Sequence, residues 1–236
     1  MNQLFRQTAQ AIFAMTALVN IYAQLQPAGA LDAASKILLM PCLAMIFISS
    51  VSRRSGSGFY LLLTALFFSW MGDVFLLYEP SSPALFIPGL AAFLIAHLIY
   101  IYLFRRMRYP AVKTPHRAFI FSRIVFLVFV GSFLYTLLFT RLGEMTLPVG
   151  FYTVVIIAMA IMALLRKERT TEKSFLLVYG GALLFVLSDA LLAIDRFHSP
   201  VQFGPALIMA SYILAQYLIV SGILDHVAGS APQERS

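Results

Sequence analysis

Eight apolar segments, each close to the length that crosses a lipid bilayer, fill most of this 236-residue chain. Hydrophobic residues make up 61% of it, and the short connections leave no room for a soluble domain. A helix needs about 20 apolar residues to cross the hydrocarbon core. We expect such helices over residues 4–25, 31–51, 58–78, 84–105, 118–140, 147–165, 174–195 and 204–224. The sequence therefore predicts an all-α, polytopic membrane protein in which residues 1–236 form a single domain of eight transmembrane helices.

The basic residues predict how these helices are oriented. An even number of helices places both termini on one side, and cytoplasmic loops carry most of the lysine and arginine. Only Arg141 and Arg196 fall on one side; the other side carries Arg6, Arg53, Arg54, Arg105, Arg106, Arg108, Lys113, Arg117, Arg123, Arg166, Lys167, Arg169, Lys173 and Arg235. We therefore expect an integral protein of a bacterial inner (plasma) membrane, with both termini cytoplasmic. The net charge of +7 reflects this bias and not nucleic-acid binding.

The first segment has an alternative interpretation as a signal peptide. Arg6 precedes its apolar run, and Ala28-Gly29-Ala30 resembles the small-residue site at which such peptides are cleaved.

Several common kinds of catalytic machinery are missing from the sequence. Cys42 is the only cysteine, so neither a disulfide framework nor a thiolate metal cluster is expected. The chain has no glycine-rich phosphate loop, no His-Glu-x-x-His zinc motif and no Gly-x-Ser-x-Gly nucleophile elbow. We expect no metal and no cofactor, and any chemistry must come from polar side chains within the helices.

Two carboxylates lie inside the apolar segments, Asp73 in residues 58–78 and Asp189 in residues 174–195. Inserting an ionised carboxylate into hydrocarbon costs roughly 2.5 to 3.5 kcal/mol, and such residues are usually functional. A structural ion pair or a hydrogen bond between helices is the alternative. A protonated carboxyl group beside an ionised one can catalyse hydrolysis as a general acid and a general base. Asp73 and Asp189 are therefore the candidate catalytic residues.

Other polar residues lie at related depths. With a rise of about 1.5 Å per residue, a shallow layer about 8 to 10 Å from the non-cytoplasmic ends of the helices holds Asp73, Asp189, Lys36 and Tyr152. Tyr212 comes slightly deeper, and both His97 and Gln216 lie about 18 Å from that face. These depths predict one funnel-shaped site that opens to the non-cytoplasmic side.

The candidate substrate-binding residues share a polar side chain inside the apolar segments, and they are Lys36, Ser69, His97, Tyr100, Tyr152, Ser188, Tyr212 and Gln216. Lys36 suits a phosphate, although Asp32 lies four residues earlier on the same helix face and could neutralise it instead. His97 suits substrate contact or proton transfer, or it is a hydrogen-bonded core residue. The hydroxyl and amide side chains could equally bond helix to helix or satisfy local carbonyls.

The two carboxylate helices also resemble each other. Residues 59–73 and 175–189 align without a gap, and each acid is followed by a leucine, Leu76 or Leu192. This pattern predicts a parallel repeat of four plus four helices related by an axis along the membrane normal. The alternative is that leucine-rich helices always align to some extent.

A set of short motifs together resembles the YhhN-like lysoplasmalogenase family. The motifs run from the second to the eighth segment: Lys36 with Pro41, Ser69-x-x-Gly72-Asp73, the spaced set of Gly89, Phe93, His97 and Tyr100, Tyr152 with Met159, Ser188-Asp189, and Tyr212 with Ala215-Gln216. Each is weak alone, and the specificity lies in the ensemble. One departure is that the family usually has proline directly after the lysine, whereas Ile37 follows Lys36 here.

The resemblance implies a membrane hydrolase that cleaves the alkenyl ether bond of lysoplasmalogens to a fatty aldehyde and glycerophosphoethanolamine or glycerophosphocholine. Its partners would be a lysophospholipid substrate and membrane lipids. Acid-catalysed vinyl ether hydrolysis needs neither a nucleophilic serine nor a metal, which suits an aspartate pair. Two alternatives stay open: a proton-coupled transporter of lipid or small solutes, and a metal-dependent hydrolase with Asp73, Asp189 and His97 as ligands.

Overall fold

The computed structural model describes residues 3–26, 29–51, 56–109 and 117–229, and these residues form eight long helices with no strand among them. The helices are α1 (Gln3–Ala23), α2 (Ala30–Ser50), α3 (Ser57–Tyr78), α4 (Phe86–Arg106), α5 (Arg117–Leu138), α6 (Thr146–Leu164), α7 (Glu172–Phe197) and α8 (Gly204–Gly229). The all-α class and the eight expected segments are confirmed, with boundaries that differ by a few residues. The proposed cleavage site includes Ala28, which lies outside the described residues.

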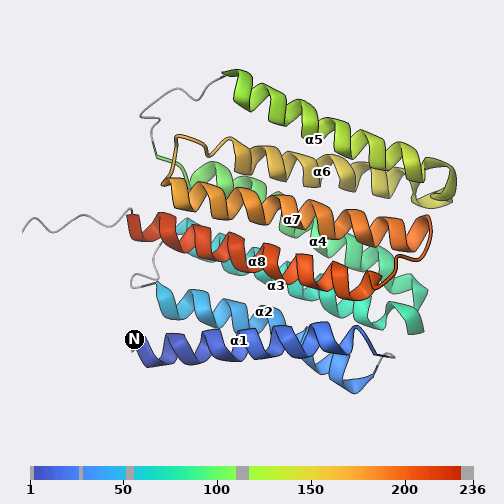
Figure 1. Ribbon diagram of the computed structural model, residues 1–236, viewed down its shortest axis with the longest axis horizontal. Coiled ribbons are helices and arrows are strands. Elements are labelled where there is room, and N and C mark those ends of the chain that lie inside the picture. The colour runs from blue at the N-terminus through green and yellow to red at the C-terminus, as the bar shows by residue number, and fades with distance from the viewer. Residues whose placement is uncertain (1–2, 27–28, 52–55, 110–116, 230–236) are drawn as a thin grey trace, which may run out of the picture.

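Seven of the eight helices are long and apolar enough to cross a membrane by length and composition, and α1 is the exception. α1 has the expected length, but Arg6, Gln7, Gln10 and Asn20 lower its hydropathy. It nevertheless packs along α2 within the bundle (Figure 1).

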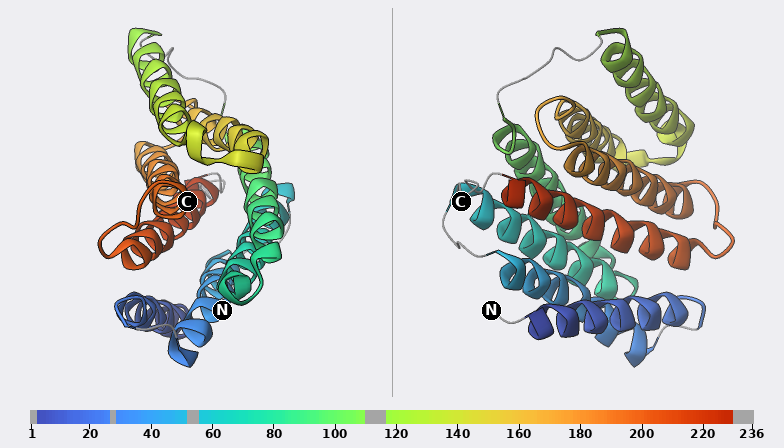
Figure 2. Two further views of the ribbon diagram at one scale, coloured as in Figure 1. Left: turned by 90° about the vertical axis from the view of Figure 1, so that its right-hand side faces the viewer. Right: turned by 60° about the vertical axis from the view of Figure 1, so that its left-hand side comes forward.

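The helices pack in two layers, as Figure 2 shows. One curved layer has the order α2, α3, α4, α6 and α5, and the second contains α1, α8 and α7. The spatial order departs from the chain order because α4 packs on α6 and not on α5. The layers meet where α1 packs on α2, α8 on α2 and α7 on α6. No relation between the two halves of the chain is established by this packing, so the four-plus-four repeat stays a prediction.

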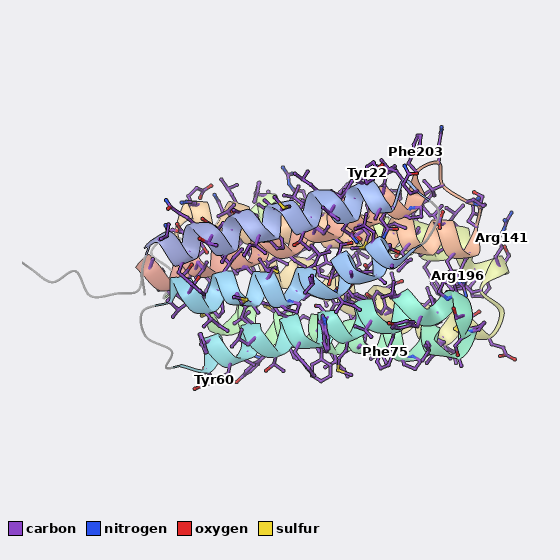
Figure 3. The ribbon with its side chains drawn as sticks, turned by 90° about the horizontal axis from the view of Figure 1, so that it is seen from below. Tyr22, Tyr60, Phe75, Arg141, Arg196 and Phe203 are labelled. Atoms are coloured by element: carbon purple, nitrogen blue, oxygen red, sulfur yellow. The ribbon has the colours of Figure 1, made fainter. Side chains whose placement is uncertain are left out.

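The start of α1 and the end of α8 lie at one end of the bundle (Figure 1). The opposite end, called the far end below, contains four short 3-10 turns: η1 (Glu79–Ser81), η2 (Pro83–Leu85), η3 (Phe139–Arg141) and η4 (Gly143–Met145). Figure 3 places Arg141 and Arg196 at the far end, opposite Tyr60. Arg53, Arg54, Lys113 and Arg235 lie outside the described residues. Which end faces the cytoplasm stays a prediction.

The core between the layers is apolar but contains a group of buried polar residues. Leu39, Leu62, Phe104 and Phe185 are fully buried in it. Ser69, Asp73, His97 and Gln216 are each no more than 3% exposed in the same region. Because an isolated buried polar group costs free energy, these side chains need partners, and their partners define the candidate site.

Candidate active site

Asp73 is held in the core by α8. It is 3% exposed, and one carboxylate oxygen, Oδ2, accepts a hydrogen bond of 2.8 Å from the Tyr212 hydroxyl. The preceding residue, Gly72, lets α4 approach: a Cβ there would lie 2.6 Å from the Phe93 ring, closer than real contacts allow. The phenylalanine ring in turn packs edge-on against Tyr212. A glycine and two aromatic rings therefore fix the position of this carboxylate.

A chain of hydrogen bonds continues from Asp73 into the core. Gln216 Nε2 donates to the Ser69 hydroxyl at 2.9 Å and to Tyr212 Oη at 3.4 Å. Its Oε1 accepts a 2.6 Å hydrogen bond from the Tyr100 hydroxyl. All these side chains are buried, and they come from α3, α4 and α8. The network satisfies both ends of the glutamine amide and ties three helices together around Asp73.

Asp189 has different neighbours on α6 and α4. Its Oδ2 accepts a 2.5 Å hydrogen bond from the Tyr152 hydroxyl and lies 4.0 Å from Nε2 of His97. His97 is fully buried, and neither ring nitrogen has a hydrogen-bond partner among the described residues. Its ring packs edge-on against Phe185, with centroids 4.6 Å apart. A gap of this size beside a carboxylate suits a bridging water.

The two aspartates line one pocket. This pocket, called the polar pocket below, is lined by Lys36, Asp73, Ser188, Asp189 and Tyr212, among others. It reaches the far end, where η1 and the end of α7 line it. Of the other expected site residues, Tyr152 lines an adjoining pocket. The remaining ones are fully buried and line neither of the two pockets; they are Ser69, His97, Tyr100 and Gln216.

Lys36 faces this pocket without the neutralising partner that its sequence context allowed. The ion pairs among the described residues do not include one between Lys36 and Asp32. Asp32 instead accepts hydrogen bonds from the side-chain amides of Asn20 and Gln24 on or just after α1. The ammonium group therefore remains available to an anionic ligand.

The helix that carries Lys36 is adapted to Pro41. Proline lacks the N–H that would bond the carbonyl four residues earlier, which here is that of Ile37. Trp70 of α3 replaces the missing donor, because its Nε1 donates to the Ile37 oxygen at 2.9 Å. The hydrogen bond that Pro41 cannot make is thus replaced by one from a neighbouring helix, at the carbonyl of the residue that follows Lys36.

Ser188 joins α7 to α8 as well as lining the pocket. Its hydroxyl donates to the Ile208 oxygen at 3.0 Å. This bond agrees with the alternative in which the serine connects helices.

Some residues of the polar pocket were not anticipated from the sequence. Glu79 and Asp195 line its far-end mouth, and Arg196 there pairs with Glu79 and lies over the Phe86 ring. The carboxyl group of Asp195 accepts a 2.7 Å hydrogen bond from the Val201 backbone N–H. The sequence did single out Arg196, because it is one of only two basic residues that the charge distribution assigns to the non-cytoplasmic side of the membrane.

A second, apolar pocket adjoins the polar one and shares Asp189 and Phe93 with it. It lies between α4, α5, α6 and α7. Asp189 is therefore on the boundary between a polar and an apolar compartment, whereas Asp73 lines only the polar one.

The metal-dependent alternative finds no support in the donor groups. Among the described residues, no three His, Cys, Asp or Glu side chains come close enough together to hold a metal ion. Asp73, Asp189 and His97 therefore do not form the ligand set that this alternative needs.

Comparisons with known proteins point to one family. The human lysoplasmalogenase TMEM86B is 32% identical over 191 residues, which is 81% of this chain and 75% of the relative. Bovine lysoplasmalogenase TMEM86A is 31% identical over 201 residues, covering 79% of this chain and 78% of the relative. A lysoplasmalogenase of Mycobacterium tuberculosis is 30% identical over 203 residues, covering 85% and 71%. No solved structure matches.

The family model that matches covers residues 31–223, so it includes every helix of the site from α2 to α8. This extent confirms the resemblance seen in the motifs from Lys36 to Gln216. The chain belongs to the YhhN family.

Proposed function

We propose that this protein is a membrane hydrolase that cleaves the vinyl ether bond of lysoplasmalogens, releasing a fatty aldehyde and glycerophosphoethanolamine or glycerophosphocholine. The observation that carries the proposal is that Asp73 and Asp189, from different helices, line one pocket together with Lys36, which forms no ion pair within 4 Å among the described residues. Each aspartate is also held by a tyrosine hydroxyl. Relatives over most of the chain are named lysoplasmalogenase, which supports the same reaction.

The position of the two pockets supports an assignment of roles. Protonation of a vinyl ether takes place at the alkene carbon on the hydrocarbon side, and the positive charge then develops at the carbon bonded to oxygen. Asp189 borders the apolar pocket, so it is placed to serve the hydrocarbon-side carbon as general acid. Asp73, in the polar pocket near the expected headgroup, is the carboxylate that stabilises the cation and activates water.

The proton balance closes over one turnover. Asp189 gives its proton to the alkene carbon, which leaves an oxocarbenium ion and an ionised Asp189. Water then adds to the cation and gives a proton to Asp73, forming a hemiacetal. As the hemiacetal collapses, its hydroxyl proton returns to Asp189, the carbon–oxygen bond to glycerol breaks, and Asp73 protonates the leaving oxygen. Both carboxyl groups are then in their starting states.

Lys36 and His97 have supporting roles in this proposal. The Lys36 ammonium binds the substrate phosphate, since it lines the polar pocket without an ion-pair partner among the described residues. His97, whose ring nitrogens have no hydrogen-bond partner among the described residues and whose Nε2 lies 4.0 Å from the Asp189 carboxyl group, holds a water beside that group. Tyr100, Ser69, Tyr212 and Gln216 hold Asp73 in place.

The test uses purified protein in nanodiscs with lysoplasmenylethanolamine as substrate, with and without a chelator. We expect aldehyde release that the chelator does not change. In D2O the aldehyde should carry one deuterium on the carbon next to the carbonyl, because that carbon receives the proton. Absence of aldehyde would refute the hydrolase and favour the transporter alternative. Loss of activity with the chelator would instead refute the metal-free mechanism.

A further inference from the structure

The last turn of α1 and the residue after it supply two side-chain amides to α2. Asn20 is fully buried, and its Nδ2 donates to the Ser35 hydroxyl at 3.0 Å and to Oδ1 of Asp32 at 3.4 Å. Gln24, just after α1, donates to the same carboxylate oxygen through its Nε2. Ser35 is itself fixed on α2, because its hydroxyl donates to the Leu31 oxygen at 2.7 Å. Two amides from the α1 segment therefore hold the Asp32 carboxyl group of α2.

The position of Asp32 on α2 favours a different partner. Lys36 lies four residues later, and an acid four residues before a lysine is the favoured arrangement for an ion pair on a helix. Asp32 also lies in the first turn of α2, where the helix dipole stabilises a negative charge. The two side chains nevertheless form no ion pair within 4 Å among the described residues. The carboxyl group is bonded to the α1 segment in place of this lysine.

This arrangement affects the polar pocket, which Lys36 lines together with Asp73 and Asp189. Gln24 lines the same pocket, so one of the two amides that bind Asp32 lies beside the space that a substrate would enter. An ammonium group that is already paired with a carboxylate binds a phosphate less tightly, because the ion pair must be broken first. The hydrogen bonds from the α1 segment therefore influence the charge that the pocket presents to a ligand.

We propose that Asn20 and Gln24 are positioning residues that hold the Asp32 carboxyl group toward α1 and so keep the Lys36 ammonium available to the substrate phosphate. The inference rests on the proposed function, in which Lys36 binds that phosphate. Neither amide has to touch the phosphate, since both act through Asp32. The role also gives a reason for Asn20, one of the polar residues that make α1 less apolar than the other seven helices.

The test measures KM and kcat for aldehyde release from lysoplasmenylethanolamine in nanodiscs. Replacing both amides, in the double variant Asn20→Leu/Gln24→Leu, releases Asp32 to pair with Lys36. We expect KM to rise by about two- to fivefold with kcat nearly unchanged, because a partly exposed ion pair then competes with the phosphate. Gln26→Leu is the matched control, since that side chain is exposed, lies two residues from Gln24 and does not line the polar pocket. It should leave KM unchanged.

Removing the Asp32 charge separates positioning from a merely structural role. In an Asp32→Asn background no carboxylate remains to pair with Lys36, so adding both amide replacements should leave KM at the value of Asp32→Asn alone. An equal rise in KM with and without the Asp32 charge would overturn the inference, because the amides would then act through packing. Gln24→Leu alone gives the same comparison if the buried Asn20 is needed for folding, since Gln24 is only partly buried.

A binding measurement separates failure of this inference from failure of the proposed function. The melting temperature is recorded with lysophosphatidylethanolamine and with a monoacylglycerol of the same chain, which lacks the phosphate. The phosphate-bearing lipid should stabilise the wild type more, and replacing both amides should reduce this difference only while Asp32 is present. If aldehyde forms but neither KM nor the melting difference responds, the inference is overturned. If no aldehyde forms, the hydrolase is refuted, and the melting shifts still decide whether the amides keep Lys36 available to an anion.

Discussion

Asp73 and Asp189 are the same residue type in two different surroundings. Asp73 is 3% exposed, and the tyrosine that bonds it belongs to a network of four polar side chains from three helices. Asp189 is only partly buried, accepts one hydrogen bond from a tyrosine and borders an apolar pocket. Each carboxyl group accepts one tyrosine hydrogen bond, but only the tyrosine at Asp73 is itself fixed by further buried polar groups, so the comparison teaches that two equal carboxyl groups differ in how firmly their surroundings are held.

The largest effect should come from removing either carboxyl group. Asp189→Ala and Asp73→Ala should each lower kcat by at least about 100-fold, as expected for loss of general acid or base catalysis. Added formate should restore part of the Asp73→Ala activity, because a small anion in the polar pocket can replace a carboxylate, but it should not rescue Asp189→Ala. Aldehyde release measures both. Rescue of Asp189→Ala alone would reverse the assigned roles, and unchanged release from both variants would eliminate the pair.

Replacing the pocket lysine should affect binding more than turnover. Lys36→Met removes a charge-assisted hydrogen bond to phosphate, so KM should rise by about 10- to 100-fold with a smaller change in kcat. Lys36→Arg should recover part of the loss. Lys173→Met is the control, because that side chain is 75% exposed on the helix end opposite the pocket. An unchanged KM for Lys36→Met would mean that the headgroup does not reach this lysine.

The two tyrosines that bond the aspartates should differ from each other. Tyr152→Phe and Tyr212→Phe each remove one donor to a carboxyl group, and we expect kcat to fall by about tenfold. Only Tyr212→Phe should also lower the melting temperature clearly, since Tyr212 belongs to the network with Gln216 and Tyr152 does not. Equal destabilisation by both variants would remove this difference between the two surroundings.

The smallest effect should come from Ser188. Its hydroxyl bonds the Ile208 carbonyl of α8, so Ser188→Ala should lower stability by about 0.6 kcal/mol, as typical hydrogen bonds between membrane helices do. Reversible unfolding in mixed micelles measures this change. A rise in KM without loss of stability would show that the serine contacts substrate instead.

Much of the fold follows from the sequence, because hydropathy acts within each segment. The eight helices were predicted within a few residues, and the cost of a charge in hydrocarbon singled out Asp73 and Asp189 before any contact was known. Depth counting along helices also worked for these two residues and for Lys36, which line one pocket. Depth counting could not reveal that Tyr152 contacts Asp189 or that Gln216 contacts Ser69, since depth contains no information on which helices are neighbours.

The sequence by itself determined that the chain crosses a membrane, where its helices lie, and which charged side chains are too costly to be incidental, because each of these depends on local composition. Only the tertiary structure decided that α4 packs on α6 and that Asp32 is hydrogen-bonded by Asn20 and Gln24, with no ion pair to Lys36 among the described residues. It also decided that Asp189 borders an apolar pocket while Asp73 does not. These features depend on which faces of distant helices meet, and the segments are too uniformly apolar for a periodic pattern to mark those faces.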